Sequence, residues 1–240
     1  SMHEVLQTYL TVMYNDTIKI ADALPLDEML LHRMKTNYNT IMKKNGGEVF
    51  CEQEDMEEFY NHGLIILEWF KKKRNMYFSK KGYELVGIEV PIGYDLPNKI
   101  KFIGYIDIVL HDTKRDRYKI IDIKTSTMGW NKYQKADKSK TDQLLLYKYF
   151  YGAEHNIPVD KIDVEYFIVK RKLYEKLDFP QRRVQTFSPA SGKPSINKLM
   201  NNLNHFLEES FIDGEYNLEH NYIKQPSKKN CRYCEFNQTE

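Results

Sequence analysis

The chain has 240 residues, a formal net charge of +2, and 41% hydrophobic and 29% charged residues, which is the composition of an ordinary soluble globular protein. Its apolar runs stay well below the ~18 residues of a membrane-spanning helix, and its N-terminus lacks the basic stretch and apolar core of a secretion signal. We therefore expect no membrane partner. Three cysteines are too few for a disulfide framework, and together with the missing secretion signal they predict a reducing compartment: the cytoplasm, or another intracellular location if the protein is viral or organellar.

The N-terminal part of the chain predicts helices. Residues 2–44 carry the apolar spacing of two or three amphipathic helices, which stop at the helix-ending signal Asn45-Gly46-Gly47. Residues 52–74 predict one long helix that contains His62. This helix is acidic at its start and basic at its end, an arrangement that the helix dipole stabilises.

A change from helical to alternating periodicity marks the start of a sheet. Residues 83–92, 101–111 and 117–124 alternate or run apolar and are rich in β-branched and aromatic residues, so they predict three strands. The polar residues 112–116 between the last two strands are typical of a hairpin turn. We therefore expect the second and third strands to pair directly.

The rest of the chain alternates helices and strands. Residues 125–140 are polar and loop-like, and Thr141 is a candidate N-cap for a helix that ends near His155. We expect a strand, its hairpin partner and a further helix over residues 162–172, 183–187 and 195–211. The order of elements predicts an α/β fold with a central mixed sheet flanked by helices.

We expect the chain to divide into three parts. Residues 1–50 would form an N-terminal helical cap, residues 51–212 the core, and residues 213–240 an irregular C-terminal tail. The tail carries two of the three cysteines and is expected to pack on the core.

Residues near the middle of the chain carry the chemistry. Asp107 and Asp122 each stand at the end of a strand in the expected hairpin. Adjacent strands lie ~5 Å apart, so both carboxylates can reach one hard cation. Lys124 projects from the same face as Asp122, which places an ammonium beside that cation. Gly104 allows backbone or substrate to approach closely. This set is what a metal-dependent phosphodiester hydrolase needs.

A helical pair follows these strands. Gln143 and Tyr147 are four residues apart and share one face of the expected helix. They could hydrogen-bond to the site or to a DNA phosphate. Core packing with polar tips is the alternative, because residues 144–146 are three consecutive leucines.

The motifs together resemble a known group of nucleases. Four runs carry the resemblance: Ile88-Glu-Val-Pro-Ile92, Gly104-Tyr-Ile-Asp107, Ile121-Asp-Ile-Lys-Thr-Ser126 and Gln143-Leu-Leu-Leu-Tyr147. They are similar to the motifs of the RecB-like branch of the PD-(D/E)XK nuclease superfamily, which includes the RecB and AddB nuclease domains, CRISPR-associated RecB-like exonucleases and phage exonucleases. The resemblance covers residues 50–155 and implies a restriction-endonuclease-like α/β fold.

The resemblance also implies roles for individual residues. Asp107 and Asp122 would bind Mg²⁺ or Mn²⁺, with the carbonyl of Ile123 completing the site. Lys124 would be the catalytic lysine. His62 stands in a helix upstream of the sheet, where such nucleases keep a metal-binding histidine. Glu89, on the first core strand, is a further candidate ligand, because members of the branch often place an acidic residue there.

Positive charge is concentrated in the C-terminal part of the chain. Residues 71–240 contain 31 Lys and Arg against 22 Asp and Glu, whereas residues 1–70 contain 5 against 12. A basic main domain suits a polyanion such as DNA. For any single basic cluster, an ordinary solvated surface is the alternative.

We expect DNA contacts from the predicted helix that carries Gln143 and Tyr147 and from the loop before it. Gln143 and Tyr147 match the Q-x-x-x-Y helix of the resembled branch, and Lys132 and Lys135 lie in a basic loop before it. Trp130 in that loop could stack on an unpaired base, which is typically worth ~1–3 kcal/mol. A simple loop anchor is the alternative for Trp130.

The cysteines leave three interpretations open. Some members of the branch hold a 4Fe-4S cluster with one upstream and three C-terminal cysteines, and Cys51, Cys231 and Cys234 match three of these positions. Glu240 occupies the fourth, and a four-thiolate cluster cannot close with three cysteines. Zinc with His220 as fourth ligand is the second interpretation. A relic that packs the tail onto the core is the third.

The expected function is that of a metal-dependent DNA exonuclease acting on single strands or DNA ends in replication, recombination or repair, alongside protein partners. A catalytically idle DNA-binding subunit and a structure-specific endonuclease are the alternatives. The intact Asp107, Asp122 and Lys124 argue against an idle subunit. The sequence contains no Walker-type phosphate loop, which argues against an ATPase motor.

Overall fold

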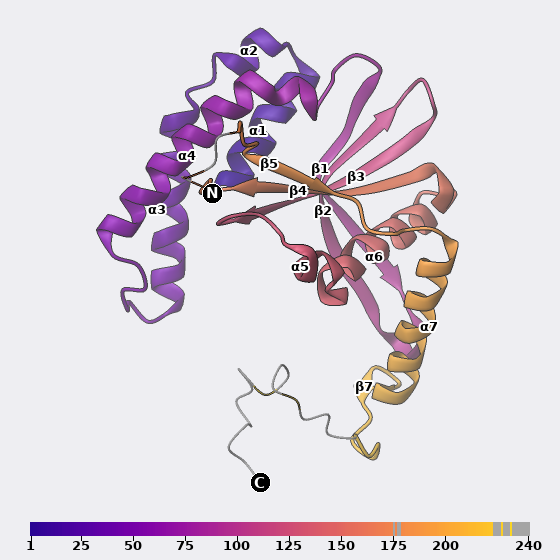
Figure 1. Cartoon of the computed structure of the whole chain (residues 1–240). Coiled ribbons are helices and arrows are strands. Elements are labelled where there is room, and N and C mark those ends of the chain that lie inside the picture. The colour runs from indigo at the N-terminus through magenta and orange to yellow at the C-terminus, as the bar shows by residue number, and fades with distance from the viewer. Residues whose placement is uncertain (175, 177–178, 223–226, 228–230, 232–240) are drawn as a thin grey trace.

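A five-stranded mixed sheet lies at the centre of the molecule (Figure 1). The computed structural model describes residues 1–174, 176, 179–222, 227 and 231. The strands follow the spatial order β1-β2-β3-β4-β5 and span Tyr83–Asp95 (β1), Lys101–Asp112 (β2), Arg117–Ser126 (β3), Ile162–Lys170 (β4) and Val184–Phe187 (β5). β3 and β4 run parallel, whereas the other neighbouring pairs are antiparallel.

Helices cover both faces of this sheet. They span Met2–Asn15 (α1), Ile18–Asp22 (α2), Leu26–Lys44 (α3), Gln53–Lys73 (α4), Lys132–Ala136 (α5), Lys138–Glu154 (α6) and Lys193–Ser210 (α7). Figure 1 shows α1 to α4 gathered on one side of the sheet and α5 to α7 on the other. α6 connects the parallel strands β3 and β4, as parallel pairing requires. The expected restriction-endonuclease-like α/β fold is confirmed.

Each face of the sheet has its own hydrophobic cluster. On the α1–α4 side, Tyr9 of α1 and Phe70 of α4 pack with Phe167 of β4, and the rings of Tyr9 and Phe70 meet edge to face at 5.5 Å. On the other side, Phe150 of α6 packs in one cluster with Ile120 of β3. The N-terminal helices therefore share a core with the sheet. The division at residues 50 and 212 stays a prediction.

Local capping explains where the helices of the basic loop begin. Asp137, and not Thr141, is the N-cap of α6, and its Oδ1 accepts a hydrogen bond from the amide of Ser139. Aspartate caps more strongly than threonine, so α6 begins earlier than the sequence pattern predicted. α5 was expected as loop, and a capping box between Asn131 and Gln134 starts it.

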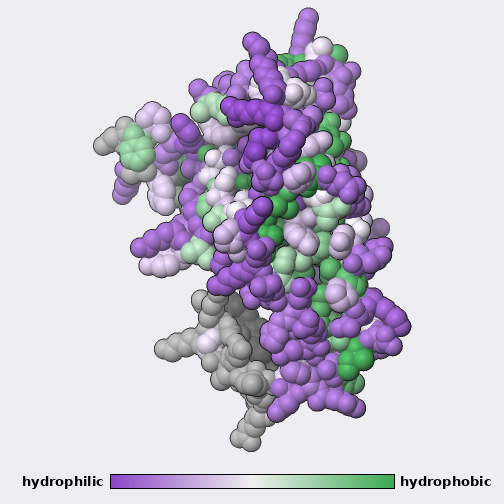
Figure 2. Space-filling view, turned by 90° about the vertical axis from the view of Figure 1, so that its right-hand side faces the viewer, coloured by the Kyte–Doolittle hydropathy of each residue, from purple (hydrophilic) through white to green (hydrophobic). Residues whose placement is uncertain are grey.

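A short ribbon and a largely hydrophilic surface lie on the α7 side of the described residues. β6 (Phe211–Ile212) and β7 (Glu215–Tyr216) form a two-stranded ribbon directly after α7. On the α7 side of the molecule, hydrophilic side chains predominate and hydrophobic ones form narrow stretches (Figure 2). Within the described residues, no helix is both long and apolar enough to span a membrane.

Candidate active site

The candidate active-site residues converge where β2 and β3 part. The ladder between these strands starts at their turn and ends at the pair Ile108↔Ile121, one residue short of Asp107 and Asp122. Beyond this pair, Asp107 Oδ2 accepts a hydrogen bond of 2.6 Å from the amide of Ile123. The backbone of β3 thus fixes the orientation of the Asp107 carboxylate.

Glu89 of β1 lies opposite Asp107, next to the paired residues Ile88 and Ile108. Its φ of 49° falls in the left-handed region, which is uncommon for residues other than glycine. Strained backbone of this kind clusters at functional sites. It gives a physical reason to consider Glu89 a functional candidate, in addition to the sequence motif.

α1 contributes two polar side chains that the sequence analysis did not single out. His3 Nε2 lies 2.8 Å from Asp107 Oδ2, and His3 Nδ1 lies 3.8 Å from Glu89 Oε1. Gln7 Nε2 donates to Glu89 Oε1 at 2.6 Å and to the carbonyl oxygen of Asp107 at 3.3 Å. His3 and Gln7 are four residues apart, so one face of α1 presents both.

One signal in the sequence of α1 could have pointed to these residues. Gln7 is buried in a helix whose other buried side chains include Leu6 and Leu10. A polar side chain on such a face needs a hydrogen-bond partner. That partner, Glu89, is 82 residues away in the sequence, so the pattern of α1 alone cannot identify it.

Lys124 links the carboxylates to α6. Its Nζ lies 2.8 Å from Asp122 Oδ2 and donates to Gln143 Oε1 at 3.1 Å. Gln143 Nε2 in turn donates to the hydroxyl of Tyr147 at 3.1 Å. A Cβ atom on Gly104 would come within 2.9 Å of the Tyr147 ring, so glycine is what lets this ring lie against β2. The structure thus connects the runs Gly104–Asp107, Ile121–Ser126 and Gln143–Tyr147 through direct contacts.

The electrostatics of this cluster favour a further cation. The side chain of Asp122 is 3% exposed, and burial raises its pKa to about 6 against the opposing effect of the Lys124 ammonium. The negative charge of Asp107 acts in the same direction as burial. A hydrogen bond to Asp107 raises the pKa of His3, although burial opposes this. Both groups hold their protons more tightly than usual, as expected of a site short of positive charge.

The donor set fits a divalent metal ion. Within the described residues, His3, Glu89 and Asp107 are the one group of three metal-ligating side chains whose ligand atoms all lie within 4.8 Å of one another. Asp122 Oδ2 is buried and has no aligned hydrogen-bond donor in the described chain besides its ion pair with Lys124. Carboxylate oxygens suit Mg²⁺ and Mn²⁺.

His62 lies on α4, outside this group. Its Nδ1 is 3.5 Å from Glu58 Oε1. Burial lowers the pKa of His62, the positive charges of Lys172 and Arg171 add to this effect, and Glu58 opposes it. A metal-ligand role for His62 stays a prediction, and the geometry favours His3 in that role.

The basic loop after β3 packs against the sheet. The ring centroids of Trp130 and Tyr166 lie 4.8 Å apart, and the Trp130 amide donates to Gln185 Oε1 at 2.7 Å. These contacts are those of a loop anchor. Lys132 and Lys135 belong to α5, and their ammonium groups lie over aromatic rings. DNA contacts by Trp130, Lys132 and Lys135 stay predictions.

The cysteine site cannot be assembled from the described residues. Cys51 and Cys231 are free thiols, and Cys234 lies outside the described part of the chain. Among the described residues, no group of three metal ligands contains a cysteine. The iron–sulfur, zinc and relic interpretations therefore stay open.

A comparison with known families agrees with this geometry. A family model described as the PD-(D/E)XK nuclease superfamily matches residues 2–239. A search of curated proteins finds no match. The chain therefore belongs to the PD-(D/E)XK nuclease superfamily, a class of nucleases that act on nucleic acids and are generally metal-dependent.

Proposed function

We propose that this protein is a RecB-like, Mg²⁺- or Mn²⁺-dependent deoxyribonuclease that degrades DNA from an end. The observation that carries the proposal is the convergence of Asp107, Asp122 and Glu89 with Lys124 where β2 and β3 part. His3 of α1 lies in the same group. Replication, recombination or repair is the proposed setting, and protein partners are expected there.

The proposed metal ligands are His3, Glu89, Asp107 and Asp122, with the carbonyl of Ile123 as a further ligand. A divalent cation bound by them would polarise the phosphodiester and would make water a stronger nucleophile at neutral pH. The amide of Ile123 already holds the Asp107 carboxylate in place, so little reorganisation is needed at this ligand.

Lys124 is proposed to position the attacking water and to balance the charge that develops on the phosphate. Asp122 and Gln143 are its two polar partners in the described chain, and an ammonium group has three N–H donors. Gln143 donates to Tyr147, which fixes the amide so that its oxygen faces Lys124. Gln143 and Tyr147 thus act as positioning residues for the ammonium.

Cleavage from an end is the proposed mode of action. α1 contacts the carboxylates from one side and α6 contacts Lys124 from the other, which supports restricted access to the site. A strand end enters a restricted site more readily than the middle of a duplex does. A covalently closed circle cut as fast as a linear strand would contradict this mode and favour an endonuclease.

The test is a cleavage assay on end-labelled single-stranded and duplex DNA with Mg²⁺, Mn²⁺ or EDTA. Wild-type protein should degrade DNA only with metal, and Lys124→Ala should lower the rate by about 100-fold or more. Lys114→Ala is the matched control, because Lys114 is exposed in the turn at the far end of the β2–β3 hairpin.

Loss of DNA binding does not explain the expected result, because binding is measured separately in EDTA. Wild-type protein that binds DNA but cleaves no substrate would overturn the nuclease proposal and support the idle DNA-binding subunit. Equal rates for wild type and Lys124→Ala would remove the lysine from the mechanism.

A further inference from the structure

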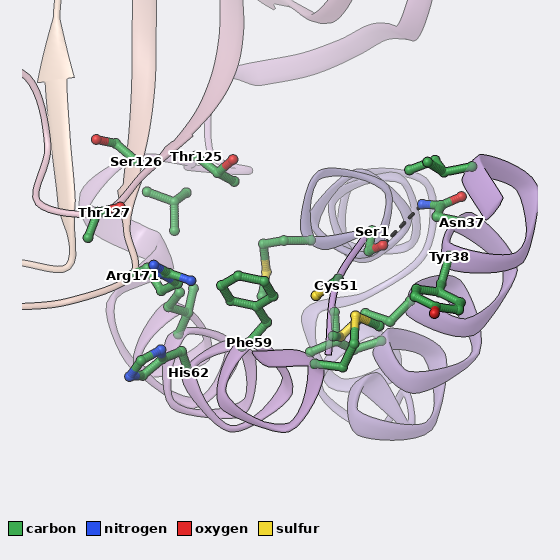
Figure 3. Close-up of a pocket in the computed structure, with 18 of the residues that line it drawn as sticks. Ser1, Asn37, Tyr38, Cys51, Phe59, His62, Thr125, Ser126, Thr127 and Arg171 are labelled. Carbon is green, nitrogen blue, oxygen red and sulfur yellow. Dashed lines mark hydrogen bonds between the residues drawn. The ribbon is translucent and has the colours of Figure 1, made fainter. Parts of the chain in front are cut away.

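A pocket of about 530 Å³ opens beside the candidate active site, between α3, α4 and the ends of β3 and β4 (Figure 3). Its walls are largely apolar and include Leu30 and Met34 of α3 and Ile66 of α4. In Figure 3, Phe59 of α4 points into the middle of this pocket. Phe59 is 39% exposed.

A second pocket of about 870 Å³ adjoins the first, because His62 and Arg171 line both. The charged side chains that line it are four cations and one carboxylate: Arg171, Lys172, Lys176, Arg183 and Glu58. Among the Lys and Arg side chains, Arg171 alone lines the first pocket, whereas four line the second, and the two pockets share His62 and Arg171.

The positive charge of the second pocket is only partly balanced within the described residues. Lys172 pairs with Glu58 at 2.7 Å. Arg171 lies over the ring of Phe59, with its guanidinium carbon 4.4 Å from the ring centroid. Arg183 donates to the carbonyl oxygen of Arg171 at 2.6 Å. Burial lowers the pKa of the neighbouring His62, and the charges of Lys172, Arg171 and Arg183 add to this effect against the opposing charge of Glu58.

The first pocket borders the active site at the start of α1, because Ser1 and Met2 line it and the next residue, His3, contacts Asp107. Lys124 is followed directly by Thr125 and Ser126, which line the first pocket. The amide of Arg171 donates to the carbonyl oxygen of Ser126 at 2.9 Å. The end of β3 is therefore tied to the segment that carries the cations.

We propose that the two pockets form one strand-binding groove for unpaired nucleotides of the strand that enters or leaves the active site. Bases occupy the apolar half against Phe59, and phosphates pair with Arg171, Lys172 and Arg183. Unpaired nucleic acid offers flat apolar bases beside a regular row of phosphates, whereas a duplex hides its bases. The proposal rests on the proposed nuclease function and names the form of DNA that the site takes.

The test measures binding without cleavage, by fluorescence anisotropy in EDTA with a labelled single strand of about 15 thymidine nucleotides. Arg171→Gln should weaken binding about five-fold or more and flatten the slope of log affinity against log salt by about 0.7. Phe59→Leu should weaken binding about five-fold or more without a change in slope. A duplex of the same length should bind Phe59→Leu and wild type equally.

Matched controls distinguish loss of the groove contacts from the effect of losing a positive charge or a phenylalanine elsewhere on the surface. Arg115→Gln removes the same charge from the exposed β2–β3 turn, and Phe206→Leu makes the same change at an exposed phenylalanine on α7. Both controls should bind the single strand within about two-fold of wild type. Thermal unfolding verifies that Phe59→Leu is folded, and Arg171→Gln tests the groove independently.

Two results would overturn the groove. One is wild-type affinity for the single strand in both Arg171→Gln and Phe59→Leu. The other is an equal loss for single strand and duplex in Phe59→Leu, because a duplex offers no bases to this ring. These outcomes are distinct from failure of the nuclease: metal-dependent cleavage with unaffected binding refutes the groove alone, and groove-dependent binding without cleavage refutes the nuclease alone.

Discussion

The carboxylate cluster and the strand-binding groove are neighbours of opposite character. The cluster concentrates negative charge, and its residues are placed by strand ladders and by a backbone hydrogen bond to Asp107. The groove concentrates positive charge, and its cations follow β4 or precede β5, where Arg171 contacts an aromatic ring of α4. The cluster must hold its ligand atoms in fixed positions to bind a metal. The groove can hold a flexible strand with long cationic side chains whose positions are less strictly fixed. The difference suggests separate roles in chemistry and in substrate binding, and three predictions test that separation.

The largest expected effect concerns the raised pKa of Asp122 and its consequence for stability. Asp122 has a pKa of about 6 in the folded chain against an ordinary value of 3.8. Between about pH 4 and pH 6 the unfolded chain releases this proton while the folded chain keeps it, so the free energy of unfolding of wild type falls with rising pH. One pKa unit corresponds to 1.36 kcal/mol, so the loss is at most about 3 kcal/mol. Asp122→Asn lacks this loss.

The measurement is urea unfolding of both proteins at pH 4.5 and pH 7.5 in EDTA. The free energy of unfolding of Asp122→Asn relative to that of wild type should increase with pH. Adding a divalent metal should restore the stability that wild type loses at the higher pH. Asp95→Asn, at an exposed position of β1, should follow wild type. If the free energies of unfolding of wild type and Asp122→Asn changed in parallel with pH, the pKa of Asp122 would not be raised in the folded chain.

The two regions also differ in how far the sequence predicts them. Asp107, Asp122 and Lys124 could be placed because a short polar turn fixes the register of a hairpin, and strand periodicity then fixes their faces. His3 could not be placed, because its partners Glu89 and Asp107 belong to strands distant in sequence. The left-handed conformation of Glu89 has no sequence signal either, since glutamate does not favour it.

The groove could not be predicted from the basic clusters of the sequence. Lys170-Arg171-Lys172 and Arg182-Arg183 stand out in the sequence as runs of positive charge, but a run alone does not distinguish a binding site from a solvated surface. Tertiary packing decides this, because Phe59 of α4 meets Arg171 only in the folded chain. The helix that carries His62 was correctly predicted, and its neighbours place that histidine beside the groove cations.

The second prediction contrasts His3 with His62. His3→Gln should lower the cleavage rate at limiting Mn²⁺ by about 10- to 100-fold, and higher Mn²⁺ should restore it, because a ligand to the metal is lost. His62→Gln should leave the midpoint of the Mn²⁺ titration unchanged. The measurement is the cleavage rate as a function of Mn²⁺ concentration at saturating DNA. A midpoint shifted by His62→Gln but not by His3→Gln would restore His62 as the ligand.

The smallest expected effect comes from Glu58, the carboxylate that lines the second pocket among the described residues. Glu58 pairs with Lys172, whose hydrogen bond holds the pKa of Glu58 below its usual value. Glu58→Gln releases Lys172 for a phosphate, so affinity for a single strand at low salt should rise about two- to five-fold. Salt screens such contacts, so the gain should vanish at high ionic strength. Anisotropy titrations at two salt concentrations measure both effects.

α4 itself supplies the control for this prediction. Glu68 pairs with Lys72 at 2.6 Å on the same helix, and neither residue lines the groove. Glu68→Gln makes the same charge change and should leave single-strand affinity unaltered. An equal gain in both variants would mean that net charge alone attracts the strand. A gain in Glu58→Gln that persists when Lys172 is also replaced by Gln would remove Lys172 from the phosphate contacts, whereas its disappearance would locate the released charge at that lysine.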